Sequence, residues 1–312
     1  MRIINVEVRQ VKVLILGDLL FQNSEEERLI SAGYELEYSE EYNGQNVDVL
    51  VGVPKDVESV FLIPQLKFIQ LLSAGYEKLD LKKLKDNSIT LANARGVYSV
   101  PMAEYVIGKI LAYYKQDNVF LEKQKEKVWY KENICLELTN KTVAILGTGS
   151  IGIEIAKRLT NFGCNILGVN TSGKEVEYFN RCYNLSDLDI VLSQSDIVVC
   201  ALPLNNETYQ IMNKNSFMQM KKDAMFINVG RGKQISENDL IDVLDHHLSC
   251  VVLDVFQQEP LPITSKLWQH PKVIITPHIS NSSELIKSRM NKLVINNLLN
   301  FINNREMENK VI

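Results

Sequence analysis

The residues best suited to chemistry in this sequence stand where short apolar runs end, and the clearest of them are glycines. The apolar run Thr142–Leu146 leads directly into the pattern GxGxxG at residues 147–152. When a strand precedes such glycines and a helix follows, the pattern predicts a site for the pyrophosphate of a dinucleotide. The first glycine permits a tight turn, the second admits the pyrophosphate to the backbone, and the third lets the helix pack on the strand.

The N-terminus of the helix that follows these glycines adds an attraction for phosphate. Its N–H groups and the partial positive charge of the helix dipole point at the bound anion. The predicted pyrophosphate site comprises Gly147, Gly149, Ser150, Ile151 and Gly152. A glycine-rich turn without a ligand is the alternative, and the flanking strand and helix disfavour it.

The residues after the next predicted strand, Asn165–Val169, bear on the choice of coenzyme. An Asp or Glu at this place would hold the 2′-hydroxyl of NAD and repel the 2′-phosphate of NADP. The chain has neutral donors and one cation there instead, at Asn170, Thr171, Ser172 and Lys174. We therefore expect NADP(H) to be favoured, with NAD(H) and a poorer ribose contact as the alternative.

Three further side chains follow apolar runs, and they are Arg231, Glu259 and His278. The carboxyl ends of parallel strands border the crevice in which α/β sheets bind ligands. The planar guanidinium of Arg231 suits a carboxylate, and the imidazole of His278 suits proton transfer near neutral pH. Glu259 can favour the imidazolium and fix its orientation. Each residue alone has a plainer interpretation, such as an arginine that closes a turn or a structural histidine. The prediction therefore depends on the convergence of all three.

With these motifs the sequence resembles the D-isomer-specific 2-hydroxyacid dehydrogenase family over nearly the whole chain. The resemblance is carried by the glycine loop and by residues 93–104, 228–232, 253–260 and 276–278. It implies that Arg231 binds the carboxylate and carbonyl of the substrate. It also implies that Glu259 supports the histidine and that His278 is the acid/base.

The same resemblance implies further contacts with the substrate and the coenzyme. Asp254 would orient the nicotinamide amide. A loop whose backbone N–H groups hold the substrate carboxylate would consist of Ser73, Ala74 and Gly75. The residues that would line the adenosine and nicotinamide sides of the coenzyme are Leu202, Pro203 and Thr208.

Apolar runs alternate with polar helical stretches along the chain, which predicts an α/β fold with parallel sheets. The expected strands are Lys12–Leu16, Glu35–Tyr38, Val47–Val51, Phe68–Leu72, Thr90–Asn93, Thr142–Leu146, Asn165–Val169, Ile197–Ala201, Met225–Asn228, Cys250–Asp254 and Val273–Thr276. The resemblance implies two domains. A Rossmann-type coenzyme domain at residues 97–281 would be inserted in a flavodoxin-like substrate domain at residues 1–96 and 282–312.

Helices are expected between these strands, some with recognisable ends. Ser24 and Glu27 form the pattern of a capping box, and Ser236 is a predicted N-cap residue. A single long helix is expected from Pro101 to Val128, and family members usually dimerise on the coenzyme domain, so it is a predicted interface element of a homodimer. Trp129 and Tyr130 are expected to pack at a helix end or interface. The other expected helices are Ser24–Ala32, Ile151–Phe162, Ser236–Asp245 and Ser282–Asn303.

Composition excludes several classes of partner. The net charge of −4 is too mild for a nucleic-acid-binding face, and no uncharged apolar run approaches the ~20 residues of a membrane span. The N-terminal run is interrupted by charges and lacks a cleavage pattern, so we expect no signal peptide and a cytoplasmic protein. The five scattered cysteines argue against a disulfide framework, and Cys164, Cys200 and Cys250 lie in apolar stretches that indicate buried thiols. The adjacent His246 and His247 offer no metal-binding spacing, so no metal is expected.

The sequence therefore predicts a dehydrogenase that interconverts a 2-keto acid and a D-2-hydroxy acid with NAD(P)(H). Glyoxylate, hydroxypyruvate or a bulkier 2-keto acid is the expected small-molecule substrate. Because the sequence ends at Ile312 without a regulatory extension, a serine-controlled phosphoglycerate dehydrogenase is not expected. The alternative is a non-catalytic dinucleotide sensor or scaffold on the same fold, and the presence of Arg231, Glu259 and His278 together favours the enzyme.

Overall fold

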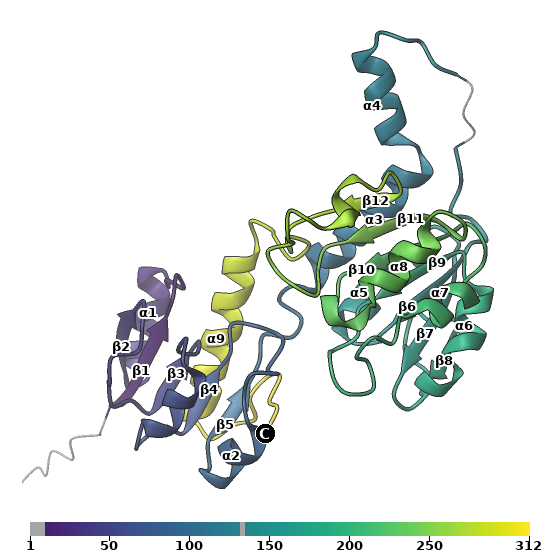
Figure 1. Cartoon of the computed structure of the whole chain (residues 1–312). Coiled ribbons are helices and arrows are strands. Elements are labelled where there is room, and N and C mark those ends of the chain that lie inside the picture. Colours follow the sequence, from purple (N-terminus) through teal and green to yellow (C-terminus); the bar gives the residue numbers. More distant parts are fainter. Residues whose placement is uncertain (1–9, 132–134) are drawn as a thin grey trace, which may run out of the picture. The chain divides into compact units, whose positions relative to one another are not determined.

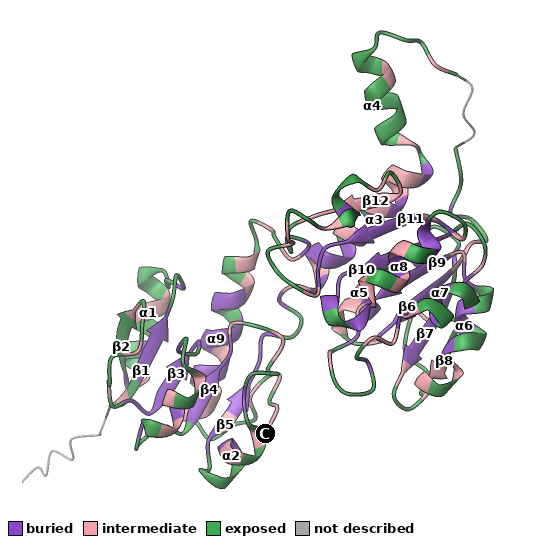
Figure 2. Cartoon of the chain, in the orientation of Figure 1, coloured by how far each residue is buried: buried purple, intermediate pink, exposed green. Residues whose placement is uncertain are grey.

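The computed structural model describes residues 10–131 and 135–312 and divides the chain into two compact units (Figure 1). Unit 1 consists of Met1–Tyr98 and Ser283–Ile312, and unit 2 consists of Ser99–Ser282. These limits lie within two residues of the domain limits expected from the sequence. Figure 2 shows buried residues along the inner strands of both sheets.

The described part of unit 1 contains a parallel five-stranded sheet in the order β2-β1-β3-β4-β5. This is the strand order of flavodoxin-like folds, so the flavodoxin-like prediction is confirmed. Its strands are β1 (Val11–Leu16), β2 (Tyr34–Ser39), β3 (Val49–Val51), β4 (Phe68–Gln70) and β5 (Thr90–Ala92). Its helices are α1 (Asn23–Ser31), α2 (Leu81–Asp86) and α9 (Ile286–Ile302), with a 3-10 turn at Val57–Leu62.

The C-terminal segment covers the outer edge of β5. Lys310 forms an antiparallel bridge with Ala92, and the N–H of Asn93 donates to the carbonyl of Asn309 at 3.2 Å. The Asn309 side chain in turn donates to the carbonyl of Arg95 at 2.7 Å. The end of the chain is therefore fixed to the segment that follows β5.

The described part of unit 2 contains a parallel seven-stranded sheet in the order β12-β11-β10-β9-β6-β7-β8. This is the Rossmann order with one added edge strand, as expected for a coenzyme domain. Its strands are β6 (Thr142–Leu146), β7 (Asn165–Asn170), β8 (Arg181–Asn184), β9 (Ile197–Cys200), β10 (Ala224–Asn228), β11 (Leu248–Leu253) and β12 (Val273–Ile275). Its helices are α3 (Ser99–Tyr114), α4 (Asp117–Lys125), α5 (Ser150–Thr160), α6 (Leu188–Gln194), α7 (Lys214–Gln219) and α8 (Glu237–Leu244). Three further 3-10 turns lie at Leu185–Asp187, Gly232–Gln234 and Lys266–Gln269.

The prediction of one long helix from Pro101 to Val128 was wrong. Gln116 adopts a left-handed conformation with φ of +59° and separates α3 from α4. Helix α3 buries an apolar face, whereas α4 buries no residue and stands away from the sheet of its unit (Figures 1 and 2). The helical spacing of apolar residues continues past Gln116 in the sequence, so the apolar pattern did not indicate that one helix ends and another begins there.

Two predicted helix caps had different outcomes. The N-cap residue of α1 is Gln22 rather than Ser24, because the Glu25 carboxylate accepts the Gln22 N–H at 2.8 Å. The capping pattern therefore begins two residues earlier than expected. Ser236 does cap α8, with its hydroxyl accepting the N–H of Asp239 at 3.4 Å.

The cysteines behave as the sequence indicated. Cys164, Cys200 and Cys250 are buried together with Cys182, and Cys135 is exposed. Burial raises the pKa of the Cys200 thiol to about 12, so this group stays protonated at neutral pH. Across residues 10–131 and 135–312, no helix has both the length and the apolar character that a membrane crossing requires.

Candidate active site

The predicted cofactor and catalytic residues of unit 2 follow strands that share one edge of its sheet. All seven strands are parallel, so their carboxyl ends lie along the same edge. The segments at that edge are the glycine loop after β6, Asn170 at the end of β7, Leu202 after β9, Arg231 after β10, Asp254 after β11 and His278 after β12. The strand order runs in opposite directions from the neighbouring strands β6 and β9, so the glycine loop after β6 lies at the topological switch point.

The three glycines of the loop fulfil three different requirements. Gly147 has φ of +107°, and a Cβ there would lie 2.7 Å from the carbonyl oxygen of Ala201. A Cβ on Gly152 would lie only 2.0 Å from the carbonyl oxygen of Gly147, so any side chain would force helix and strand apart. A Cβ on Gly149 would meet no atom within 4 Å. Gly149 therefore faces open space, as a position that admits a ligand to the backbone must.

The N-terminus of α5 fits a phosphate group. Gly149 is its N-cap residue, so no side chain caps the helix, and its first turn contains no acidic residue. The first N–H groups of a helix lack intrahelical acceptors and carry the positive end of the dipole. The donors of Ser150 and Ile151 are thus suited to the pyrophosphate of a dinucleotide.

Asn170 has a different role from that expected for a ribose-contacting residue. Its amide nitrogen donates to the Thr148 hydroxyl at 3.1 Å and to the Lys174 carbonyl at 3.0 Å. Its amide oxygen accepts the backbone N–H of Ser172 at 3.1 Å. Asn170 therefore ties the glycine loop to the 170–174 turn, and the remaining polar groups of that turn are those of Thr171, Ser172 and Lys174.

Hydrogen bonds from two side chains, those of Thr208 and Gln234, fix the segment after β9. Thr208 is buried, and its hydroxyl donates to the Pro203 carbonyl at 2.7 Å. The Gln234 amide donates to the carbonyls of Leu202 at 2.7 Å and Pro203 at 3.1 Å. The Thr208 side chain therefore shapes the loop, while the backbone of Ala201 and Leu202 borders Gly147.

The turn that carries Arg231 is rigidly constructed. The buried Asn228 accepts the N–H of Gly230 at 3.0 Å and donates to the carbonyl of Arg231 at 3.1 Å. The Gln234 side chain accepts the Arg231 N–H at 2.8 Å. A Cβ on Gly232 would lie 1.8 Å from the carbonyl carbon of Phe256, so this turn packs directly against the segment after β11.

Glu259 and His278 form the predicted pair. Nδ1 of His278 lies 2.8 Å from Oε2 of Glu259, and the other carboxylate oxygen accepts the N–H of Phe256 at 3.0 Å. Because a carboxylate only accepts, Nδ1 carries the proton of this bond and Nε2 faces away from Glu259. The His278 side chain is 45% exposed, so a substrate can reach it. The Phe256 contact also connects the pair to the Arg231 turn.

Asp254 is fully buried and holds the segment that contains His278. Its carboxylate accepts the Thr276 hydroxyl at 2.7 Å and the N–H groups of Ile279 and Ser280, each at 2.9 Å. A carboxylate offers about four acceptor positions, and three of those of Asp254 are occupied by donors of the segment that contains His278. Sequence patterns did not indicate Asp254 as a loop anchor, because its donors lie more than twenty residues away.

The predicted substrate loop belongs to unit 1 and is fixed by its carbonyls. The carbonyl of Ala74 accepts the Asn93 amide at 2.8 Å, and that of Ser73 accepts the N–H of Ala94 at 2.9 Å. The Tyr98 hydroxyl donates to the carbonyl of Leu72 at 2.5 Å. Among the described residues the N–H groups of Ala74 and Gly75 have no acceptor, so they can bind an anion.

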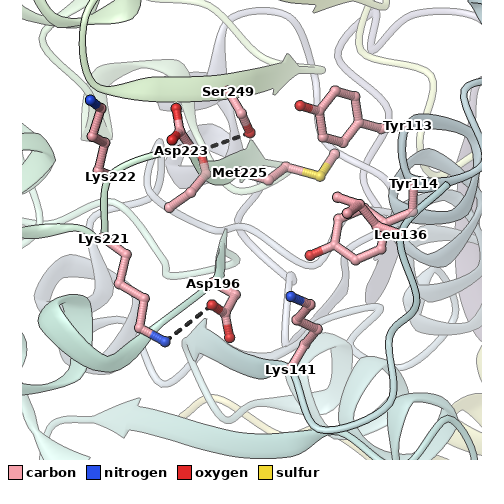
Figure 3. Close-up of a pocket in the computed structure, with 11 residues that line it drawn as sticks. Tyr113, Tyr114, Leu136, Lys141, Asp196, Lys221, Lys222, Asp223, Met225 and Ser249 are labelled. Atoms are coloured by element: carbon pink, nitrogen blue, oxygen red, sulfur yellow. Dashed lines mark hydrogen bonds and ion pairs between the residues drawn. The ribbon is translucent and has the colours of Figure 1, made fainter. Parts of the chain in front are cut away.

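A cavity of about 240 Å³ lies at the opposite edge of the unit 2 sheet (Figure 3). Lys141, Asp196 and Asp223 directly precede β6, β9 and β10, so the cavity borders the amino ends of the strands. Lys221 pairs there with Asp196 at 3.1 Å. This cavity contains none of the predicted catalytic or coenzyme residues. No group of three or more potential metal ligands occurs within the described ranges.

One residue at the site was missed by sequence reasoning. The Tyr105 hydroxyl on α3 forms a hydrogen bond with the Thr276 hydroxyl, across a sequence separation of 171 residues. Within α3 the tyrosine has only the pattern of a residue on a half-buried helix face, so no local signal distinguishes it.

Comparisons with known proteins agree with this geometry. Residues 107–280 match the family described as D-isomer specific 2-hydroxyacid dehydrogenase, NAD binding domain. A glyoxylate reductase of Thermofilum pendens is 33% identical over 78% of this chain and 74% of its own. A D-isomer specific 2-hydroxyacid dehydrogenase family protein of Aeromonas salmonicida superposes with a TM-score of 0.81 at 32% identity, covering 97% and 99% of the two chains.

A third relative was solved with a coenzyme. It is the NADPH-dependent glyoxylate/hydroxypyruvate reductase of Sinorhizobium meliloti, in complex with NADP and sulfate. Its TM-score is 0.80 at 27% identity, over 97% of this chain and 98% of that one. Fold, motif geometry and sequence similarity agree, and the chain belongs to the D-isomer-specific 2-hydroxyacid dehydrogenases, a family of nicotinamide-dependent oxidoreductases.

Proposed function

We propose that this protein reduces a small 2-keto acid, such as glyoxylate, hydroxypyruvate or a bulkier homologue, to the D-2-hydroxy acid and catalyses the reverse oxidation. The observation that carries the proposal is the 2.8 Å bond between His278 and Glu259 beside the Arg231 turn. The names of the Thermofilum and Sinorhizobium relatives support the substrate class.

Each residue has a defined task in this reaction. The bound nicotinamide supplies the hydride. Nε2 of His278 donates the proton to the carbonyl oxygen, and Glu259 orients the ring through its bond to Nδ1. The guanidinium of Arg231 pairs with the substrate carboxylate and polarises the carbonyl. The N–H groups of Ala74 and Gly75 in unit 1, which have no acceptor among the described residues, are suited to a carboxylate.

The test measures NADPH and NADH oxidation with glyoxylate, hydroxypyruvate, pyruvate and bulkier 2-keto acids. His278→Asn should lower kcat by about 10²-fold or more, the usual worth of a general acid, and leave the Kd of the coenzyme unchanged. His246→Asn, an exposed histidine outside the site, is the matched control. If the wild-type protein binds the coenzyme but turns over no keto acid, the chain is a dinucleotide sensor instead.

NADP(H) is the coenzyme that we propose. The support is the absence of an acidic residue from 170–174, together with Lys174 and the hydroxyls of Thr171 and Ser172 at that turn. Lys174→Ala should weaken NADPH binding by about tenfold, since one charge-assisted contact is lost, and leave NADH binding unchanged. Lys222→Ala at the opposite edge is the control. An equal loss for both coenzymes would favour the NAD interpretation.

We also propose a homodimer built on unit 2 of a cytoplasmic enzyme. Its support is the exposed apolar surface of α4 and the residues after it, including Leu121, which is 54% exposed, and Trp129, which is 87% exposed. Among the described residues Trp129 is largely exposed and is not buried against a helix end, so an interface remains its predicted place. Leu121→Asp should reduce the mass measured by light scattering to that of a monomer. Leu62→Asp, at a position in unit 1 that is 75% exposed, should not.

A further inference from the structure

His278 has an unusual backbone conformation. Its φ of +53° lies in the left-handed region, which a residue with a Cβ seldom adopts without support from its surroundings. The N–H of His278 donates to the carbonyls of Asp254 at 2.8 Å and Thr276 at 3.0 Å. These two bonds maintain the strained backbone of His278, so the direction of the imidazole depends on the segments that contain Asp254 and Thr276.

The Asp254 carboxylate is the centre of that support. It gathers one donor from Thr276 before the histidine and two from Ile279 and Ser280 after it. The backbone N–H of Asp254 donates to the carbonyl of Asn228 at 3.1 Å, which fixes Asp254 to β10. The loop is thus clamped at both ends to one buried anion.

The clamp has an outer support on α3. The Thr276 hydroxyl gives its proton to Asp254, so it must accept the hydrogen bond that it shares with Tyr105. Burial raises the pKa of Tyr105 to about 12, which keeps the phenol protonated and able to donate at neutral pH. The ammonium of Lys109 lies 5.1 Å from the centre of the same ring, within cation–π range.

We propose that Tyr105 is a positioning residue for the acid/base His278. Its phenol donates to Thr276, directs the Thr276 hydroxyl onto Asp254, and so maintains the left-handed turn that aims the imidazole. Tyr105 does not touch the reacting atoms. This inference rests on the proposed role of His278, and its test is chosen to be separable from that role.

The first measurement needs no turnover. The sequence contains four histidines, so the imidazole Cε1–H signal of His278 can be assigned by NMR with His278→Asn. Tyr105→Phe should shift or broaden that signal and leave the other three unchanged. Tyr113→Phe removes a phenol from the same helix and should leave the His278 signal in place.

The second measurement uses steady-state kinetics with the best keto acid. Tyr105→Phe and Thr276→Val should each lower kcat by about five- to tenfold, the effect of losing one buried hydrogen bond, with unchanged coenzyme Kd. Thr276→Ser retains the hydroxyl and should restore most of the activity. The double variant should lose no more than either single variant, since both interrupt one chain of hydrogen bonds.

The outcomes distinguish the two proposals. An unchanged His278 signal in Tyr105→Phe, or additive losses in the double variant, would overturn the positioning role. A changed signal in a protein that turns over no keto acid would support the positioning role and overturn the proposed function. Equal effects of Tyr105→Phe and Tyr113→Phe on both readouts would reduce Tyr105 to a general packing residue.

Discussion

The first strand of each unit leads into a turn at the topological switch point of its sheet, yet the two turns differ in what they can bind. Strand β1 is followed by Gly17 with φ of +86°, and β6 is followed by Gly147 with φ of +107°. After β1 the chain buries Leu19 and Phe21 before α1 begins. After β6 the helix begins within four residues of the strand, at Ser150.

The N-termini of α1 and α5 differ in charge, and this determines what each can bind. At α1 the carboxylate of Glu25 accepts the N–H of Gln22, and Glu26 adds a second negative charge to the first turn. At α5 the N-cap is Gly149 and the first turn has no acid. In α1 a carboxylate of the helix itself thus interacts with the positive end of the helix dipole, whereas in α5 that end remains available to an external anion. Topology supplies two equivalent places, and side chains decide that only one of them suits phosphate.

The largest effect is expected from closing the tight contact at α5. Gly152→Ala places a Cβ 2.0 Å from the carbonyl oxygen of Gly147, so the free energy of unfolding should fall by about 3 kcal/mol and coenzyme binding should be lost. Chemical denaturation and coenzyme titration check this. Gly108→Ala on α3, where a Cβ meets no atom within 4 Å, is the control and should retain full stability. Unaltered coenzyme affinity in Gly152→Ala would contradict the assigned role of the loop.

A smaller effect is expected from giving α5 the character of α1. Ser150→Asp places a carboxylate where the pyrophosphate is proposed to bind, so coenzyme affinity should fall about tenfold while stability holds or rises slightly. Calorimetric titration with NADPH measures this. Ser24→Asp makes the corresponding change in α1 and should leave the affinity as it is. A similar loss in both variants would mean that net charge, not location, is responsible.

The smallest effect is expected from the opposite change in α1. Glu25→Gln weakens the acceptor for Gln22 and for the Asn291 amide, which donates to Glu25 at 3.0 Å. The free energy of unfolding should fall by about 1 kcal/mol, with no new affinity for dinucleotide or phosphate. Thermal melts with and without phosphate test it. If phosphate stabilises this variant, the Glu25 carboxylate alone had prevented an anion from binding at the N-terminus of α1.

The sequence was most informative where all the residues that determine a feature lie in one contiguous segment. Strand β6, the glycines and α5 are contiguous, so their pattern predicted both structure and ligand. Arg231, Glu259 and His278 were found because each follows a predicted strand, and parallel strands end at one edge. The His278–Glu259 bond followed from that rule even though nineteen residues separate the two.

Features that depend on distant partners were not predictable. Tyr105 acquires meaning only through Thr276, and Asp254 becomes a clamp only because the chain after β12 returns over it. The break between α3 and α4 at Gln116 is a backbone conformation that interrupts no apolar pattern. Strand β8 was not predicted, because Arg181–Asn184 is a polar edge strand without alternation.

The C-terminal segment has a consequence for any manipulation of that end of the protein. Asn309 is bound to Asn93 and Arg95, and Asn93 also donates to Ala74 in the proposed substrate loop. Proteolytic removal of the last residues, or a bulky fusion to them, is therefore expected to weaken binding of the keto acid and to leave binding of the dinucleotide unchanged. In kinetics, such damage would raise the KM for the acid and leave coenzyme saturation curves superimposable on those of the intact enzyme.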